Sequence, residues 1–130
     1  MIDLAINKKP LEVYGNGTNI RDWLHVTDNC EAIKLVMEKG KKGEIYNIGA
    51  NNEMSNNQVA KIIADRFKVP IKYIKDRSGH DFRYSIDCTK IQEELGWKPN
   101  TKFGDGLEKT IVLYIKEEYK KDLEATKGYD

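Results

Sequence analysis

The chain has 130 residues, a length typical of one domain, and 39% of them are hydrophobic, which is enough to build a core. Its 22 basic residues almost balance its 21 acidic residues, which excludes binding to nucleic acid or to an anionic membrane through overall charge. No apolar run reaches the roughly 18 residues of a membrane helix, and the N-terminus has no secretory pattern, so we expect a cytoplasmic protein.

The cysteines and histidines predict neither a disulfide framework nor a metal site. Cys30 and Cys88 lie far apart and match no Cys-x-x-Cys spacing, so we expect two buried, reduced thiols. His25 and His80 are not accompanied by Cys, Asp or Glu residues at the spacing of metal ligands. We therefore expect no bound metal.

The first predicted elements are a short apolar segment and a hairpin. Residues 1–9 are too few for a confident helix before the proline that follows them. Residues 11–14 and 21–26 alternate apolar and polar side chains on either side of Gly15 and Gly17. Because glycine tolerates the positive φ of a tight reversal, this pattern predicts a β-hairpin.

A helix and a strand are predicted next. Asp28 and Glu31 form a capping-box pattern that opens a helix ending at Gly40. Four apolar residues recur at helical spacing and predict the face that this helix turns to the core: Cys30, Ile33, Val36 and Met37. Residues 44–49 are dense in strand formers, which predicts a strand.

The second half of the chain predicts three more helices and one strand. Ser55 and Gln58 form a second capping box, and the helix that they open closes at Pro70, before a strand at residues 71–75. A short helix begins at Asp87 or Thr89 and ends at Gly96, with Trp97 closing the core, and a long amphipathic helix runs from Phe103 to about Asp122. The sequence thus predicts a mixed α/β fold in which a β-hairpin and short strands pack with three to four helices.

Three places on the chain favour an anion. Arg21, on the returning strand, is placed to bind a phosphate or carboxylate through two parallel hydrogen bonds, although a surface ion pair is the more common role of an arginine. Asn56 lies beside the unpaired N–H groups of a helix start, or is a plain first-turn residue. Residues 76–84 carry Arg77 and His80, and so many cationic groups face either water or an anion.

Four blocks of the sequence carry a family resemblance. They are Tyr14-Gly15-x-Gly17-x-x-Ile20-Arg21-Asp22-Trp23-Leu24-x-Val26-x-Asp28, Gly43-Glu44-x-Tyr46-Asn47-Ile48-Gly49, Asp76-Arg77-x-Gly79-His80-Asp81-x-Arg83-Tyr84-x-Ile86-Asp87, and Glu94-Leu95-Gly96-Trp97-Lys98-Pro99. In this order they resemble the C-terminal part of the dTDP-glucose 4,6-dehydratases, which are extended short-chain dehydrogenase/reductases. The resemblance implies that residues 1–130 are a single C-terminal substrate-binding domain, truncated so that the N-terminal NAD-binding Rossmann part is absent.

The resemblance also implies a function and a site. The parent lyases convert dTDP-glucose to dTDP-4-keto-6-deoxyglucose with NAD, in deoxysugar biosynthesis. The expected ligand is therefore a dTDP-sugar nucleotide, bound by seven residues that match the family's site: Lys9, Leu11, Tyr14, Arg21, Asn56, Arg77 and His80. Two positions depart from the family, because Glu12 and Ser78 stand where proline is usual, and both changes are expected to lower affinity for an anion.

The catalytic part of such an enzyme is not found in these residues. A dinucleotide site needs a Gly-rich turn between a strand and a helix, whereas Gly15-x-Gly17 and Gly104-x-Gly106 are lone pairs. None of the 7 tyrosines is followed four residues later by the lysine of a Tyr-x-x-x-Lys pair. We therefore expect this chain alone to bind no NAD and to be catalytically inactive.

Two functional alternatives stay open. The chain could be the corresponding lobe of another nucleotide-sugar epimerase or decarboxylase, or a non-catalytic nucleotide-binding or interaction module. In the family, the strand from Ile45 to Ile48 joins the sheet of the cofactor domain. We expect it to mediate self-association here, or pairing with the missing cofactor domain.

Overall fold

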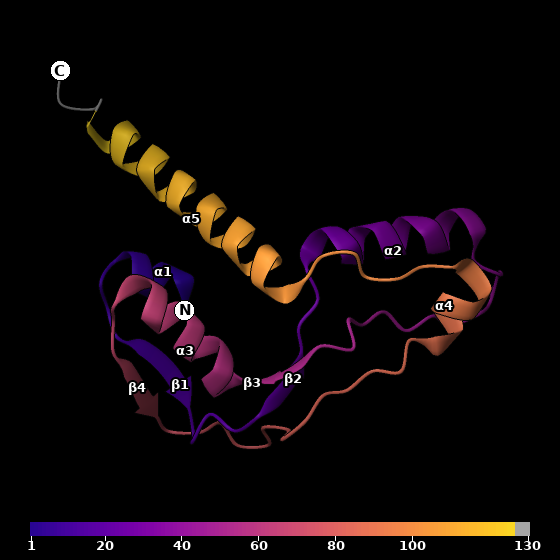
Figure 1. Cartoon of the computed structure of the whole chain (residues 1–130), viewed down its shortest axis with the longest axis horizontal. Helices are drawn as coiled ribbons and strands as arrows, with labels where there is room; N and C mark the ends of the chain where they lie inside the picture. Colours follow the sequence, from indigo (N-terminus) through magenta and orange to yellow (C-terminus); the bar gives the residue numbers. More distant parts are fainter. Residues whose placement is uncertain (127–130) are drawn as a thin grey trace.

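The computed structural model describes the backbone of residues 1–126 and the side chains of residues 1–118. Within these residues the chain forms five helices and four short strands, a mixed α/β fold (Figure 1). In chain order they are α1 (Ile2–Ile6), β1 (Leu11–Tyr14), β2 (Ile20–Asp22), α2 (Val26–Lys39), β3 (Glu53–Ser55), α3 (Asn56–Phe67), β4 (Ile71–Ile74), α4 (Thr89–Leu95) and α5 (Phe103–Thr126). No helix in this part of the chain has the length and apolar character needed to cross a membrane.

The predicted hairpin is wrong, because β1 and β2 belong to different two-stranded sheets. β1 pairs in parallel with β4, and β2 pairs antiparallel with β3. The turn between them is held by the start of α3, where the backbone N–H of Asn57 donates to Gly17 O at 2.9 Å and that of Asn56 donates to Asn19 O at 3.0 Å. The glycines therefore fold the turn over a helix end and direct β2 away from β1.

The start of α2 also differs from the predicted capping box. His25 is the N-cap, and its Nδ1 accepts a hydrogen bond from Thr27 N at 3.3 Å. Asp28 lies inside the helix, only 2% exposed, where its carboxylate accepts from the backbone N and the hydroxyl of Thr101. The predicted end at Gly40 is confirmed. The capping prediction failed because the Asp28 carboxylate bonds to Thr101, 73 positions later in the chain, and does not cap the helix.

Two clusters of buried side chains form the core. The first lies between α1, β1 and α3 and includes Leu11, Val59 and Ile63. The second lies between α2, α4 and residues 44–49, and includes Ala32 and Trp97, which is 6% exposed as predicted. Figure 1 shows the elements of these clusters at opposite ends of the molecule, joined by β2 and β3.

The outer face of α2 was predicted to be core and is exposed instead. Met37 is 82% exposed and Ile33 is 46% exposed, and Cys30 is an exposed free thiol, contrary to the predicted burial. Val36 packs against the second cluster as predicted, together with Ala32, which was not predicted. Of the two cysteines, only Cys88, which is 1% exposed, is buried as expected.

Residues 44–49 do not form a strand in this structure. Tyr46 and Ile48 pack against the second cluster while Ile45 is 79% exposed, which is the alternation of an extended segment. Within the described residues no hydrogen bond joins the backbone of residues 45–48 to another segment. The strand prediction is therefore wrong for this chain, since a strand requires a neighbour with which to pair.

The remaining predicted elements are confirmed with small shifts. Ser55 and Gln58 form the complete capping box of α3, β4 follows Pro70, and Gly96 ends α4 in the left-handed conformation. α4 starts with the backbone N–H of Thr89 bonded to the carboxylate of Asp87 at 2.8 Å. Among the side chains of α5 that the structure describes, that of Ile111 is the most deeply buried, and the helix projects away from the two clusters (Figure 1).

Candidate functional site

The loop after β4 brings three of the predicted site residues together at the end of β1. The Arg77 guanidinium carbon lies 4.7 Å from the centre of the Tyr14 ring, a cation–π contact. Arg77 Nη2 lies 3.2 Å from His80 Nε2, and the His80 ring meets Tyr14 edge-on at 6.5 Å between ring centres. Tyr14, Arg77 and His80 therefore form one cluster, which we call the loop cluster.

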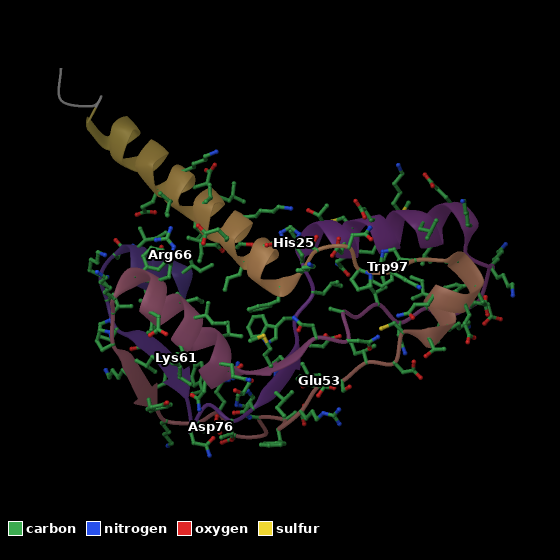
Figure 2. All side chains as sticks on the ribbon, in the orientation of Figure 1. His25, Glu53, Lys61, Arg66, Asp76 and Trp97 are labelled. Atoms are coloured by element: carbon green, nitrogen blue, oxygen red, sulfur yellow. The ribbon has the colours of Figure 1, made fainter. Side chains whose placement is uncertain are left out.

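Asp76 contacts two residues of the loop cluster, His80 and Arg77. Its Oδ1 lies 2.8 Å from His80 Nδ1 and also accepts from the backbone N–H of Arg77 at 2.8 Å. These bonds, first that from His80 and then that from Arg77, hold the pKa of Asp76 below its usual value. Figure 2 shows Asp76 on the long segment that runs from β4 along one edge of the molecule.

Gly15 makes room for this carboxylate. Its φ is +59°, and a Cβ placed there would lie 2.7 Å from Asp76 Oδ2. The glycine pair that resembled a turn signal in the sequence thus has a second use, which is to let Asp76 approach the end of β1.

Arg21 reaches the same loop from β2. Its Nη2 donates to Asp81 O at 2.9 Å and its Nη1 donates to Ile20 O at 2.6 Å. The guanidinium carbon lies 4.5 Å from the centre of the Tyr84 ring. The loop carbonyls and the ring fix this arginine on the strand, as a preorganised anion contact requires.

Tyr84 connects the two arginines. Its hydroxyl donates to Asp81, and this bond raises the pKa of Tyr84, while the positive charges of Arg21 and Arg77 act in the opposite direction. Both guanidinium groups therefore lie within electrostatic reach of one phenol. Arg77 belongs to the segment of residues 76–84, and Arg21 contacts the same segment through Asp81 O and the Tyr84 ring.

The other three predicted residues do not join this cluster through their side chains. The N–H groups beside Asn56 are already used, because those of residues 56 and 57 donate to turn carbonyls and that of Gln58 donates to Ser55 Oγ at 3.2 Å. The expectation of unpaired N–H groups at this helix start is therefore wrong. Leu11 is 0% exposed in the core, and its N–H pairs with Pro70 O, so neither its side chain nor its backbone is accessible to a ligand in this structure. Lys9 is exposed.

A bidentate ion pair beside the loop was not predicted. Arg83 Nε and Nη2 donate to the two carboxylate oxygens of Glu53 at 2.8 and 2.7 Å. With a further bond from Ser85, this contact lowers the pKa of Glu53 to about 2. Figure 2 shows Glu53 on β3 facing the loop segment. The pair attaches the loop to β3, and only the density of charge in residues 76–84 hinted at it.

The two Gly-x-Gly pairs do not fit a dinucleotide site. Gly15 and Gly17 are followed by β2 and not by a helix, and the Gly17 turn is filled by Asn57. Gly104 and Gly106 lie inside the first turn of α5, where Gly106 lets the helix approach the His25 ring. Neither arrangement offers the strand, turn and helix start that bind a pyrophosphate in NAD proteins.

An apolar cavity of about 480 Å³ lies away from the loop cluster. It is lined by residues of α1, α3, α5 and the segment before α2, among them Trp23, His25 and Phe103. None of the seven predicted site residues lines it. The candidate ligand surface is therefore the open face of the loop cluster with Arg21, and not this cavity.

Comparisons with known proteins agree with the sequence blocks. The family model described as GDP-mannose 4,6 dehydratase matches residues 1–110. A probable dTDP-glucose 4,6-dehydratase from Sinorhizobium fredii is 44% identical over 125 residues, which are 88% of this chain and 36% of the relative. These matches confirm the resemblance carried by the four blocks.

Solved structures give the same result for the fold. The dTDP-glucose 4,6-dehydratase of Bacillus anthracis, in complex with NAD, superposes with a TM-score of 0.85 and 44% identity over 91% of this chain and 38% of its own. UDP-glucose 4-epimerase of Thermotoga maritima, with UDP-glucose, superposes with a TM-score of 0.82 and 29% identity over 89% of this chain and 38% of its own. The chain spans less than two fifths of the length of each of these relatives.

Proposed function

The chain belongs to the GDP-mannose 4,6 dehydratase family of extended short-chain dehydrogenase/reductases, and on this premise we propose that it is the nucleotide-sugar-binding, C-terminal part of a dTDP-glucose 4,6-dehydratase. The ligand is a dTDP-sugar, and its diphosphate contacts Arg21 and Arg77. One observation carries this proposal: Arg21 of β2 bonds to Asp81 O and stacks on the Tyr84 ring, in the same segment of residues 76–84 that carries Arg77. Similarity to dTDP-glucose 4,6-dehydratases at 44% identity, against 29% for the UDP-glucose epimerase, supports dTDP as the nucleotide.

Each residue of the proposed site has a separate role. Arg77 binds a phosphate from the position that it holds over one face of the Tyr14 ring, so the ring orients the arginine for the ligand. Arg21 stays on β2 and directs its remaining N–H groups to the same diphosphate. Asn56 and Lys9 complete the rim, while His80 supports Arg77.

We propose that this chain binds the sugar nucleotide without converting it. NAD, bound by full-length relatives, supplies hydride transfer there, and the glycine pairs of this chain do not fit that cofactor. Reduced thiols at Cys30 and Cys88 support a cytoplasmic location. Among the residues that the structure describes, the backbone of residues 45–48 has no hydrogen-bond partner, which supports association with a second copy, or with a cofactor domain when one is present.

Isothermal titration calorimetry with dTDP, UDP and NAD tests the binding proposal. We expect dTDP to bind more tightly than UDP, and the variants Arg21→Ala and Arg77→Ala each to lose about 1.5–3 kcal/mol of binding free energy, the contribution of a charged hydrogen bond. Arg66→Ala is the matched control, because Arg66 pairs with Glu108 on an exposed surface away from the loop cluster. A preference for UDP would identify an epimerase-type lobe instead. Absence of nucleotide binding, or an equal loss in the control, would overturn the proposed site.

A further inference from the structure

We propose that Asp76 is a positioning residue, which fixes the tautomer of His80 and thereby holds the Arg77 guanidinium against the Tyr14 ring. The inference rests on the proposed function, because it assigns a role within the same site. It is carried by the arrangement of donors and acceptors along the row formed by Asp76, His80 and Arg77.

The partners of His80 determine where its proton lies. An ionised carboxylate only accepts hydrogen bonds, so the 2.8 Å contact with Asp76 Oδ1 requires a proton on His80 Nδ1. A guanidinium only donates, so the 3.2 Å contact with Arg77 Nη2 requires a lone pair on Nε2. His80 is therefore the neutral Nδ1–H tautomer, and the Nε2 lone pair is an acceptor aimed at Arg77.

The other histidine has the opposite arrangement. His25 Nδ1 accepts from the backbone N–H of Thr27 at 3.3 Å, so the proton of a neutral His25 lies on Nε2. Because no carboxylate hydrogen-bonds to this ring among the described residues, His25 is an internal reference for the effect of Asp76.

Asp76 is itself held in place by groups that do not touch a ligand. Its Oδ1 also accepts from Arg77 N at 2.8 Å, and its Oδ2 faces Gly15 at the end of β1, where a side chain would displace it. The His80 side chain is only 8% exposed, so the ring cannot turn freely once Asp76 orients it. Arg77 thus starts from one defined position, which lowers the ordering cost of binding a diphosphate.

The test combines a spectroscopic readout with ligand binding. In ¹⁵N-resolved imidazole spectra of the ligand-free chain, we expect Nδ1 of His80 and Nε2 of His25 to carry the protons. We also expect upfield ring-current shifts for the Arg77 side-chain protons, because the guanidinium lies over Tyr14. In Asp76→Ala the preference of His80 for Nδ1–H and the Arg77 ring-current shift should both be lost, and dTDP affinity should fall about tenfold.

Two further variants separate positioning from loop collapse. Asp76→Asn keeps an oxygen acceptor for Nδ1–H, so it should retain the tautomer and more of the dTDP affinity than the alanine variant. Asp65→Ala removes the same charge from the exposed pair with Lys61 and should change neither readout. An unchanged His80 tautomer or unchanged Arg77 shift in Asp76→Ala would overturn the inference. Failure of the wild-type chain to bind dTDP would overturn the proposed function instead, and the ligand-free spectra would still decide the role of Asp76.

Discussion

The buried carboxylate of Asp28 accepts hydrogen bonds from Thr101 N at 2.9 Å and from Thr101 Oγ1 at 3.0 Å. These bonds tie the first turn of α2 to the residues that precede α5. Asp28→Ala would leave the Thr101 N–H without its partner in a largely buried position, and we expect it to lower the free energy of unfolding by about 1.5–3 kcal/mol. Urea unfolding followed by circular dichroism measures the change.

Glu31→Ala is the control for this prediction. The sequence pattern assigned Asp28 and Glu31 to one capping box, whereas the structure gives the cap to His25 and leaves Glu31 exposed. We expect the Glu31 variant to change the free energy of unfolding by less than about 0.5 kcal/mol. Similar losses in both variants would show that the capping box forms and that the contact with Thr101 contributes little.

Alanine substitutions at Gly17 and Gly43 compare the energetic cost of a steric clash plus backbone strain with that of backbone strain alone. Both have positive φ, +71° and +85°, but a Cβ at Gly43 meets nothing within 4 Å, whereas one at Gly17 collides with Asn57 Oδ1. Gly43→Ala should cost only the backbone strain of about 1–2 kcal/mol. Gly17→Ala should cost at least about 1 kcal/mol more, because Asn57 also donates to Asn16 O at 2.8 Å. Equal losses of unfolding free energy in the two variants would contradict the contact with Asn57.

Local signals in the sequence were sufficient for the start of α3 and the end of α4. Ser55 and Gln58 satisfy each other within one turn, and Gly96 adopts the left-handed conformation where the sequence placed it. The short reach of these interactions explains their success, since all partners lie within four residues. The same reasoning predicted that the charged residues 76–84 face either water or an anion.

Contacts between distant residues were beyond sequence reasoning. Alternation in β1 shows that Leu11 and Val13 are buried, but the same alternation suits a parallel neighbour such as β4 as well as a hairpin partner. A capping pattern at Asp28 could not reveal a partner at Thr101. In the candidate site, Arg21 and Arg77 were predicted from their chemistry, whereas the proposed role of Asp76 required the positions of His80 and Gly15.

The ion pair of Glu53 and Arg83 predicts a pH dependence of stability. The pKa of Glu53 falls from 4.5 to about 2 on folding, mainly through its bonds with Arg83. A lowered folded-state pKa gives stability that is fully present above pH 4.5 and is lost as the pH falls from 4.5 towards about 2. The difference in unfolding free energy between the wild-type chain and Glu53→Gln should therefore be largest above that range and shrink through it. If the difference in unfolding free energy between the wild-type chain and Glu53→Gln stays constant from neutral pH down to about pH 2, the lowered pKa of Glu53 is contradicted.

The exposed backbone at residues 45–48 predicts self-association by strand pairing. Ile45 is 79% exposed, and within the described residues the main chain of this segment has no hydrogen-bond partner. Such an edge pairs with another chain, and a charged side chain on it opposes that pairing. Sedimentation velocity over a range of concentrations should show association of the wild-type chain, and Ile45→Lys should shift it to monomer with little change in stability. Met37→Lys is the control, because Met37 is 82% exposed but lies on α2. Monomer formation in the Met37 variant, with association retained in the Ile45 variant, would assign the interface to the outer face of α2 instead.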